Sequence, residues 1–333
     1  MNELITLAHG NGGYFMRQLI EEIFAAHLEN PCLDTKTDAA SLPILEGELM
    51  MSVDGFTVKP LEFPGGNIGS LAIHGTVNDL AVSGAIPKYL SLAVIIEEGL
   101  EQTTLSRIIG SMAEAARDAG VRIICGDTKV VPKGEGSGIY ITTTGIGVRA
   151  KTPNLGLGQI KSKDKILLSG PIGDHGTAVM LAREQFGLKG NIKSDAATVL
   201  PLCQALYDLP GLRFMRDPTR GGLATVLHEI ARATNLGIRV YESQIPIRDE
   251  VISVCEILGY DPFYLACEGR VVAIVDEKQA DVALERWQGI PSGQQASIIG
   301  GINNDLAQVV LETELGGERV LEELEDDPLP RIC

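Results

Sequence analysis

The sequence predicts an α/β or α+β fold, because stretches with one apolar helical face alternate along the chain with short apolar runs. TLSRIIGSMAEAARDAG has the helical spacing, with Thr103 or Thr104 suited to cap its start and Gly120 suited to end it. The strand VRIICGD follows directly. The same order returns in GGLATVLHEIARATNLG, which the strand IRVY follows.

Further strand-like runs lie on either side of these helices. In chain order they are LMMSVDGFTV, YLSLAVIIE, GIYITTTGIGV, KILLSGPIG and GRVVAIVD. Ahead of them, YFMRQLIEEIF predicts an amphipathic helix with Phe15, Leu19, Ile20 and Ile23 on its apolar face.

The chain of 333 residues is long enough for two domains, each with its own core. The segment 149–164, RAKTPNLGLGQIKSKD, is rich in glycine, lysine and polar residues and separates two strand–helix blocks. We expect an N-terminal domain over 1–155, a C-terminal domain over 156–316 and a flexible acidic tail over 317–333. VLEELE can form a helical turn in this tail, but Pro328 and Pro330 prevent a helix from running to the end.

Composition indicates a soluble globular protein, with 44% hydrophobic and 22% charged residues. No apolar run is long enough to span a bilayer, and the start does not resemble an export signal, so we expect a cytoplasmic protein. The net charge of −16 repels nucleic acid and anionic membranes, so neither is expected as a partner. It also repels nucleotide phosphates, so ATP binding would require a bound cation.

The six cysteines are scattered without a CxxC pair, which predicts neither a zinc site nor a disulfide framework. Cys333 differs from the others because it is the last residue, where a thiol is free to move. Fully extended, residues 323–333 reach about 35 Å, enough to cross a domain. A terminal thiol on such a tail raises the question of whether a group is attached there and carried.

Glycines precede the first helix in AHGNGGYFMRQL. Gly10, Gly12 and Gly13, with Asn11 among them, would let backbone N–H groups approach an anion at a helix start. The pattern is neither a Walker A motif nor a Rossmann fingerprint. On spacing alone, a flexible leader with a glycine turn is the favoured explanation.

Aspartates recur at strand ends or among small residues. They are Asp38, Asp54, Asp79, Asp127 and Asp217. Carboxylates are ligands that Mg²⁺ prefers, so together they indicate a magnesium site. Taken singly, each is explained by a helix cap or a turn, and the sequence leaves both interpretations open.

DPTRGGLATVLHEI has the strongest physical features of an anion site. Asp217 and Pro218 set a turn, Thr219 and Arg220 can donate to phosphate, and the Gly221–Gly222 pair opens a helix. A capped turn with a surface arginine is the alternative.

A possible acid–base pair comes from two further stretches. Lys129 follows Asp127 after a buried strand. Glu268 lies in FYLACEGRVVAIV, an apolar setting that should raise the pKa of its carboxyl group and suit it to proton transfer. Alternatively, Glu268 forms an ion pair with Arg270.

Taken in order, these stretches resemble the HypE family of hydrogenase maturation proteins, which are carbamoyl dehydratases. The matching segments are HGNGG, SVDGFTVKPLEFPGGNIGSLAIHGTVNDLAVSGAIP, GDTKVV, DHGTAV, DPTRGGLAT, FYLACEGR and the terminal PRIC. ATP-binding relatives that resemble aminoimidazole ribonucleotide synthetase, selenophosphate synthetase and thiamine monophosphate kinase share the aspartates and the DPTRGG-like loop but lack the cysteine tail. The family commonly has serine where this chain has Asn11.

The resemblance implies an aminoimidazole ribonucleotide synthetase-like fold of two domains. The N-terminal domain would pair with its twin in a homodimer to build a barrel, and the C-terminal α/β domain would cover one side of an ATP cleft. ATP contacts are expected from Gly10, Asn11, Gly12, Gly13, Asp54, Asn78, Asp79, Asp127, Asp217, Thr219, Arg220, Gly221 and Gly222. Mg²⁺ ligands are expected among Asp38, Asp54, Asp79, Asp127 and Asp217.

The resemblance also implies a reaction. A partner, HypF, would place a carbamoyl group on Cys333, and this chain would use ATP to dehydrate the S-carboxamide to an S-cyanide. Glu268 would act as general base with Lys129 beside it. The cyanide would then pass to iron in a HypC–HypD complex for [NiFe]-hydrogenase.

Two other classes compete with this interpretation. An ATP-dependent small-molecule kinase or synthetase of the same superfamily would stay active without Ile332 and Cys333. A non-enzymatic interaction protein with a metal-binding or dimer-pairing thiol would hydrolyse no ATP.

Overall fold

The computed structural model describes residues 4–35, 37, 39–149, 155–183, 190–305 and 307–324. The chain divides into two compact units, one over residues 1–80 and 85–150 and the other over 81–84 and 151–332. The division at 150 lies just before the predicted boundary at 155. None of the helices in the described ranges has both the length and the apolar character that a membrane crossing requires.

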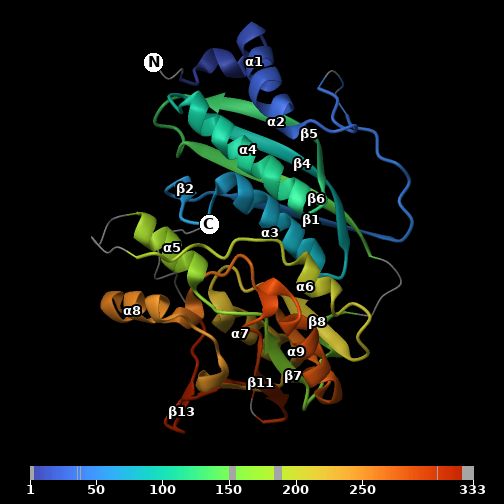
Figure 1. The fold of residues 1–333 in the computed structure, drawn as a ribbon, viewed down its shortest axis with the longest axis vertical. Coiled ribbons are helices and arrows are strands. Elements are labelled where there is room, and N and C mark those ends of the chain that lie inside the picture. Colours follow the sequence, from blue (N-terminus) through green and yellow to red (C-terminus); the bar gives the residue numbers. More distant parts are fainter. Residues whose placement is uncertain are drawn as a thin grey trace. The chain divides into compact units, whose positions relative to one another are not determined.

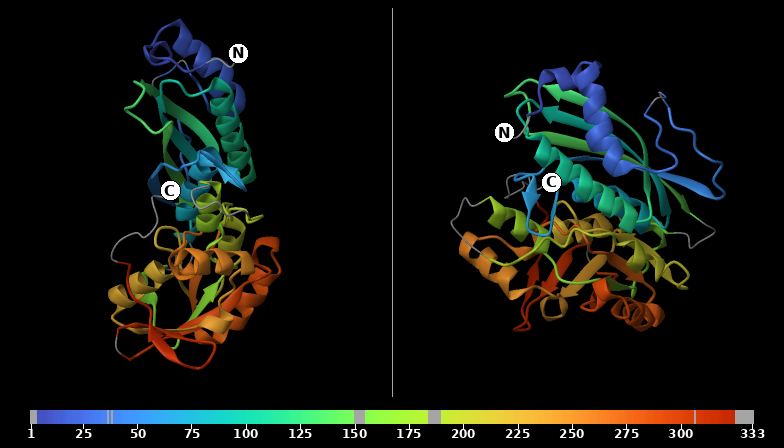
Figure 2. Two further views of the ribbon diagram at one scale, coloured as in Figure 1. Left: turned by 90° about the vertical axis from the view of Figure 1, so that its left-hand side faces the viewer. Right: turned by 45° about the horizontal axis from the view of Figure 1, so that its top comes forward.

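The first unit contains a sheet whose four described strands lie in the order β1-β6-β4-β5. The strands are β1 (Glu48–Phe56), β4 (Ile86–Glu97), β5 (Arg122–Val131) and β6 (Ile139–Arg149). Helices α3 (Ile68–Val82) and α4 (Gln102–Asp118) cover one face of this sheet (Figures 1 and 2). The predicted apolar face of α4 is confirmed, since Leu105, Ile108, Ile109, Met112 and Ala116 are all buried.

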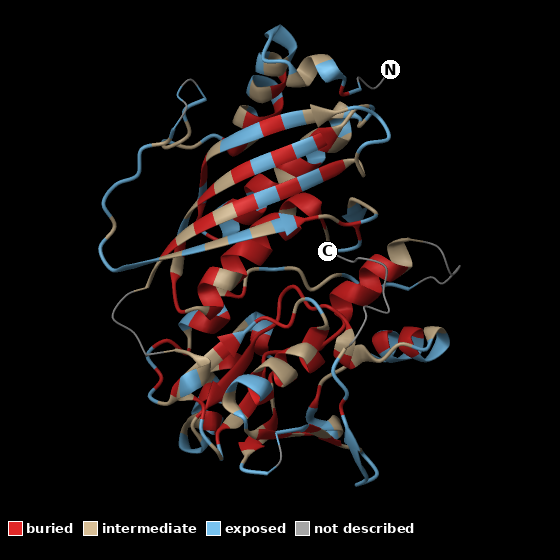
Figure 3. Cartoon of the chain, turned by 180° about the vertical axis from the view of Figure 1, so that it is seen from behind, coloured by how far each residue is buried: buried red, intermediate tan, exposed pale blue. Residues whose placement is uncertain are grey.

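The opposite face of the sheet carries exposed apolar side chains. Strand residues alternate between buried and exposed along the sheet (Figure 3). Leu49, Met51 and Val53 on β1 are 61%, 72% and 59% exposed, and Ile95 on β4 and Tyr140 on β6 are exposed too. These five residues form what we call the outer apolar face, which is unusually apolar for a solvent-facing sheet surface.

The N-terminal segment runs through short helical turns before the sheet. In order these are η1 (Leu7–Gly10), α1 (Tyr14–Leu19), the π-helical η2 (Ile20–Ala25) and α2 (Ala26–Leu28). Leu19 and Ile23 are buried as predicted, whereas Phe15 is 53% exposed and therefore does not belong to the apolar face. A short hairpin of β2 (Glu62–Phe63) and β3 (Gly66–Asn67) precedes α3.

The second unit contains a larger sheet with the described strand order β13-β12-β9-β11-β7-β10-β8. The strands are β7 (Lys165–Leu168), β8 (Leu212–Arg216), β9 (Gly237–Tyr241), β10 (Val272–Val275), β11 (Ser297–Asn303), β12 (Val309–Glu312) and β13 (Glu318–Val320). All residues of β10 are buried, as its sequence VAIV predicts.

The second unit also contains helices and short helical turns. The helices are α5 (Asp174–Ala182), α6 (Leu200–Gln204), α7 (Gly222–Thr234), α8 (Asp249–Leu258) and α9 (Ala280–Gln288), and the 3₁₀ turns are η3 (Leu157–Gln159), η4 (Glu242–Gln244), η5 (Pro262–Tyr264), η6 (Glu277–Gln279) and η7 (Pro291–Gly293). The predicted inward face of α7 is confirmed, because Leu223, Val226, Leu227, Ile230 and Ala231 join the core of this unit.

The structure corrects the predicted start of the tail. Residues 318–320, at the start of the predicted flexible tail, form β13 and pair with β12. Leu321 is fully buried, and its carbonyl oxygen lies 2.8 Å from Nε2 of His228. Tyr264 Oη donates to the carbonyl of Glu322 at 2.8 Å. The chain is therefore attached to the second unit through Glu322, beyond the predicted boundary at 317.

Candidate functional site

The glycine loop before α1 rests against strand β5. A Cβ on Gly10 would lie 2.9 Å from the Cβ of Val130, so only glycine fits this contact. Gly12 has φ +75°, and its N–H donates to the weak acceptor Sδ of Met16 at 3.2 Å. A Cβ on Gly13, which precedes α1, would meet no atom within 4 Å. The loop therefore has room beside it, as an approaching anion requires.

A cavity of about 180 Å³ lies next to this segment, between the first helical turns and the edge strand β5. Its walls combine apolar side chains such as Met16 and Phe24 with polar groups that include Asp34 and Asp127. Mostly apolar walls with a few polar groups are typical of small-molecule sites.

The predicted aspartates of the first unit lie on two faces of the sheet. Asp79 on α3 accepts a hydrogen bond from Ser52 Oγ at 2.6 Å, and a Cβ on Gly75 of α3 would lie 3.9 Å from Asp54 Oδ2. Asp54 and Asp79 therefore lie on the helix-covered face. Asp127 aligns with Ala93 of β4, on the opposite face.

A register shift between β4 and β5 explains the position of Asp127. The pairing passes from Leu90–Ile123 to Ser91–Cys125, so Ile124 is skipped. A bulge of this kind moves every later side chain of the strand to the other face.

The described residues do not assemble the predicted five-aspartate cluster. No group of three or more His, Cys, Asp or Glu side chains in the described ranges is placed to hold a metal ion. Asp38 and Cys333 lie outside the described residues. Asp217 belongs to the second unit, and Asn78 is buried on α3. The ligand set as a whole stays a prediction.

Lys129 lies beside Asp127, as expected from their spacing. Its Nζ is 3.5 Å from Asp127 Oδ2, and the two side chains are 67% and 61% exposed. Such an exposed pair adds little stability, so both groups are available to a ligand.

In the second unit, the DPTRGG stretch forms a tight loop at the start of α7. Gly221 and Gly222 have φ +70° and +61°. A Cβ on Gly222 would lie 2.6 Å from the carbonyl oxygens of Phe263 and Leu265, so glycine is required there. Asp217 is buried, whereas Arg220 at the turn is exposed. Close contacts and positive φ thus account for both glycines, and the role of the loop as an anion site stays a prediction.

The loop that carries Glu268 is attached to the DPTRGG loop. The N–H of Cys267 donates to the carbonyl of Pro218 at 3.0 Å, and Glu268 itself is 4% exposed. The N–H groups of Glu268 and Gly269 both donate to the carboxylate of Asp195, at 3.1 and 3.3 Å. Sequence analysis missed Asp195, which lies in an irregular segment.

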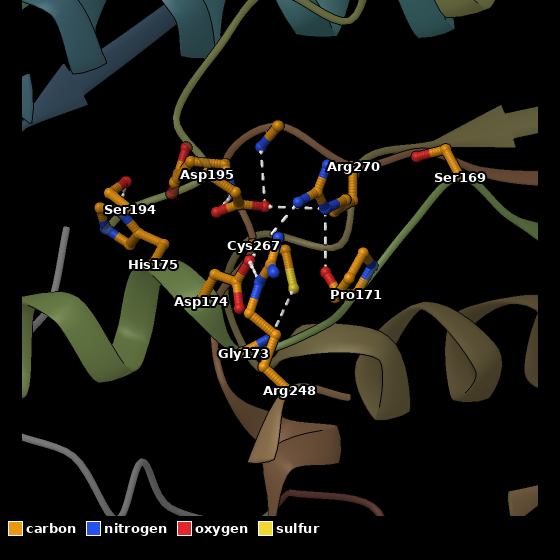
Figure 4. Close-up of polar contacts among 12 residues, drawn as sticks. Ser169, Pro171, Gly173, Asp174, His175, Ser194, Asp195, Arg248, Cys267 and Arg270 are labelled. Atoms are coloured by element: carbon orange, nitrogen blue, oxygen red, sulfur yellow. Dashed lines mark hydrogen bonds and ion pairs between the residues drawn. The ribbon is translucent and has the colours of Figure 1, made fainter. Parts of the chain in front are cut away.

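A chain of buried charges continues from Asp195 (Figure 4). Arg270 Nε lies 3.4 Å from Asp195 Oδ2 and donates to the carbonyl of Pro171 at 2.9 Å. Arg270 Nη2 lies 3.5 Å from Asp174 Oδ2, which also accepts from Arg248 Nε at 2.9 Å. The ion pairs of Arg270 thus go to aspartates that the sequence analysis did not consider. The quoted segment DHGTAV, which begins at Asp174, was the available signal.

Burial shifts the pKa of several groups in and around these linked charges. Desolvation raises the pKa of Asp195 and Asp174, although the neighbouring arginines oppose the shift. It lowers the pKa of His175 to about 3, so this imidazole is neutral at physiological pH. Burial also raises the pKa of Cys267 well above its usual value, which keeps it an unreactive thiol.

Comparison with known proteins places the chain in a family context. It matches the family models for the N-terminal domain of AIR synthase related proteins over residues 36–149 and for their C-terminal domain over 161–311. It is 46% identical to the carbamoyl dehydratase HypE of Azotobacter vinelandii, across 100% of this chain and 98% of that one.

Solved structures agree with these matches. A hydrogenase maturation protein HypE in complex with ATP has a TM-score of 0.93 and 43% identity, covering 98% of this chain and 99% of that one. HypE from a HypE–HypF complex has a TM-score of 0.81 and 45% identity, covering 92% and 99%. The predicted two-domain fold is therefore confirmed.

Gly222→Ala tests the close contact at the DPTRGG loop. We expect it to lower the free energy of unfolding by about 1–2 kcal/mol for the left-handed backbone and about 1–3 kcal/mol more for the overlap with two carbonyl groups. Gly259→Ala is the control, because Gly259 has φ +74° but no atom within 4 Å of its Cβ position. Urea unfolding measures the free energy of unfolding of both variants. Equal decreases in the two would contradict the close contact at Gly222.

Proposed function

This chain belongs to the HypE family of carbamoyl dehydratases, and on that premise we propose that it uses ATP to dehydrate an S-carboxamide on its own Cys333 to a thiocyanate. The observation that carries the proposal is the match to a carbamoyl dehydratase across the whole chain, which extends to the terminal cysteine. The product supplies the cyanide ligand for the iron of [NiFe]-hydrogenase during maturation.

The attachment of the C-terminal segment supports a carrier role for Cys333. Leu321 is buried in the second unit, and the side chain of Leu324 lies within 3.5 Å of where a Cβ on Gly221 would be. Leu324 thus lies beside the DPTRGG loop, and the nine residues that follow it in the sequence could span at most about 30 Å if fully extended. This reach allows the thiol to visit its own nucleotide site as well as a partner protein.

In this proposal each unit offers donors to the nucleotide. In the first unit, the Gly10–Gly13 loop offers N–H groups and open space. In the second, Thr219, Arg220 and the Gly221–Gly222 turn offer donors at the start of α7. A solved relative contains ATP, which supports the same ligand here.

Magnesium fits the carboxylates of the first unit. Asp54 and Asp79 lie on one face of the sheet and supply the hard oxygen donors that Mg²⁺ prefers. Asp38, Asp127 and Asp217 remain predicted further ligands. When bound, the ion offsets phosphate charge that a protein of net charge −16 would otherwise repel.

The chemistry makes the amide oxygen a good leaving group. The carboxamide oxygen attacks the γ-phosphate, ADP leaves, and loss of one N–H proton gives an imidate-like phosphate. Loss of the second N–H proton and of phosphate then leaves the nitrile on sulfur. Glu268 accepts a proton from nitrogen, and Lys129 contacts the transferred phosphoryl group.

Partners follow from the same premise. HypF carbamoylates Cys333, and a solved HypE–HypF complex of relatives supports this assignment. The HypC–HypD complex accepts the cyanide. These steps belong to the cytoplasm.

The protein forms a homodimer through the outer apolar face. Leu49, Met51 and Val53 are too apolar to remain in water on a sheet surface of this size. Asp127 and Lys129 lie on the same face, at the β5 edge, so a partner subunit would border these two residues.

Glu268→Gln tests the proposed base. We expect normal carbamoylation of Cys333 and normal ATP binding, but dehydration slower by about 10²–10⁴-fold, because the nitrogen proton has no acceptor. Intact-mass analysis after mixing with HypF and ATP would show the carbamoylated species persisting. Cys333→Ala is the negative control, and Cys203→Ala, which removes a buried thiol, should behave as wild type. A wild-type dehydration rate in folded Glu268→Gln would refute the assignment.

Asp79→Asn tests the magnesium site. We expect ATP affinity in the presence of Mg²⁺ to fall by about 10-fold or more, since a charged ligand is lost. Affinity without Mg²⁺ should change little. Calorimetric titration measures the ATP affinity with and without Mg²⁺. The same titration is made for Asp127→Asn, and Asp118→Asn, at an exposed residue, is the control. If both variants keep the wild-type affinity and magnesium requirement, these aspartates are structural.

Met51→Lys tests the dimer. The new charge on the outer apolar face should reduce the mass measured by light scattering from about twice the chain mass to 35.6 kDa. Ile257→Lys, at a 66% exposed apolar residue of the second unit, should leave the mass unchanged. A wild-type protein that is already 35.6 kDa at working concentration would count against the dimer.

A further inference from the structure

The carboxylate of Asp195 lies directly against the backbone that carries Glu268. Its Oδ1 accepts the N–H of Glu268 at 3.1 Å, and its Oδ2 accepts the N–H of Gly269 at 3.3 Å. Two consecutive N–H groups bound by one carboxylate fix the direction of a turn, because both peptide planes must face the same acceptor.

Gly269 adds a steric constraint to these hydrogen bonds. A Cβ at this residue would lie 1.9 Å from the carbonyl oxygen of Asp195, so the two backbones are in direct contact. The position of Glu268 therefore depends on the segment around Asp195 and cannot adjust independently of it.

Asp195 is itself held in place by the buried charges. Its side chain is 1% exposed, and Nε of Arg270, whose side chain is 11% exposed, lies 3.4 Å from its Oδ2. Arg270 is fixed by the carbonyl of Pro171 and by Asp174, and Arg248 binds Asp174 from the surface (Figure 4). Negative and positive side chains alternate in this row of ion pairs, so each buried charge in it has a partner.

We propose that Asp195, held by Arg270, is the positioning residue for Glu268 in the dehydration step. The proposal rests on the proposed function, in which Glu268 accepts the nitrogen proton. Asp195 does not contact the substrate; it sets where the Glu268 side chain begins. General bases lose efficiency when displaced, and a shift of about 1 Å can cost roughly 100-fold in rate.

Asp195→Asn tests this role. The amide keeps the shape but offers one acceptor oxygen, so one of the two N–H groups would face an NH₂ group. We expect single-turnover dehydration at saturating ATP to slow by about 10- to 100-fold, with carbamoylation of Cys333 and the ATP concentration for half-maximal rate unchanged. Asp208→Asn is the matched control. This carboxylate also pairs with an arginine of the second unit, Arg286, at 2.6 Å, but it is 79% exposed and should leave the rate unchanged.

The double variant Asp195→Asn/Glu268→Gln separates positioning from a general structural effect. If Asp195 acts through Glu268, the double variant should be no slower than Glu268→Gln alone. Multiplication of the two losses, or a wild-type rate in Asp195→Asn, would overturn the proposal. A wild-type rate in Glu268→Gln alone would instead show that the proposed base is wrong, and the proposed role of Asp195 would be refuted with it.

Arg270→Lys provides the test if Asp195→Asn does not fold. Lysine keeps the positive charge beside Asp195 but lacks the planar fork that also binds Pro171 and Asp174. We expect a folded protein with slower dehydration and faster amide hydrogen exchange in the peptide 266–270. A wild-type rate with unchanged exchange would refute the proposal.

Discussion

Charges that lie out of water, and must therefore be paired, determine the geometry of the second unit. Asp195, Asp174 and Arg270 have side chains that are 1%, 3% and 11% exposed. A buried ion pair contributes little net stability, but loss of one partner costs about 3–5 kcal/mol. The segments 170–174 and 267–270 are held together with Asp195 by this requirement, although much of their backbone is irregular. Glu268, the proposed base, lies on such a segment and gains the rigidity that regular secondary structure would otherwise supply.

Close backbone contacts at glycines complete the same arrangement. At Gly222 a side chain would overlap the carbonyls of the segment before Glu268, and at Gly269 it would overlap the carbonyl of Asp195. The N–H of Cys267 joins the two loops through the carbonyl of Pro218. The DPTRGG loop, the Glu268 loop and the Asp195 segment are therefore one connected body of backbone. The DPTRGG loop is thereby held at a fixed distance from Glu268.

The sequence predicted those features that periodicity controls and missed those that depend on distant contacts. The inward faces of α4 and α7 follow from helical spacing, and each predicted apolar residue on them is buried. Asp195 could not be found in this way, because it contacts residues 73 and 74 positions further along the chain and lies outside any periodic element. The separation of Asp127 from Asp54 and Asp79 depends on one skipped residue, Ile124, which apolar patterning does not reveal. β13 was missed for a similar reason, since its charged residues form a strand only because β12 supplies an edge.

The attachment of the C-terminal segment reconciles two opposing demands on a carrier residue. In the proposed function the thiol meets a carbamoyl donor, an ATP site and a cyanide acceptor, and a residue within a strand or a helix could not travel between them. A tether that is too long lowers the effective concentration of the thiol at its own site. Burial of Leu321 and the hydrogen bonds from Tyr264 and His228 attach the chain to the second unit as far as Glu322, which limits the tether to the residues that follow. The point of attachment, rather than the length of the acidic segment in the sequence, therefore sets which sites the cysteine can reach.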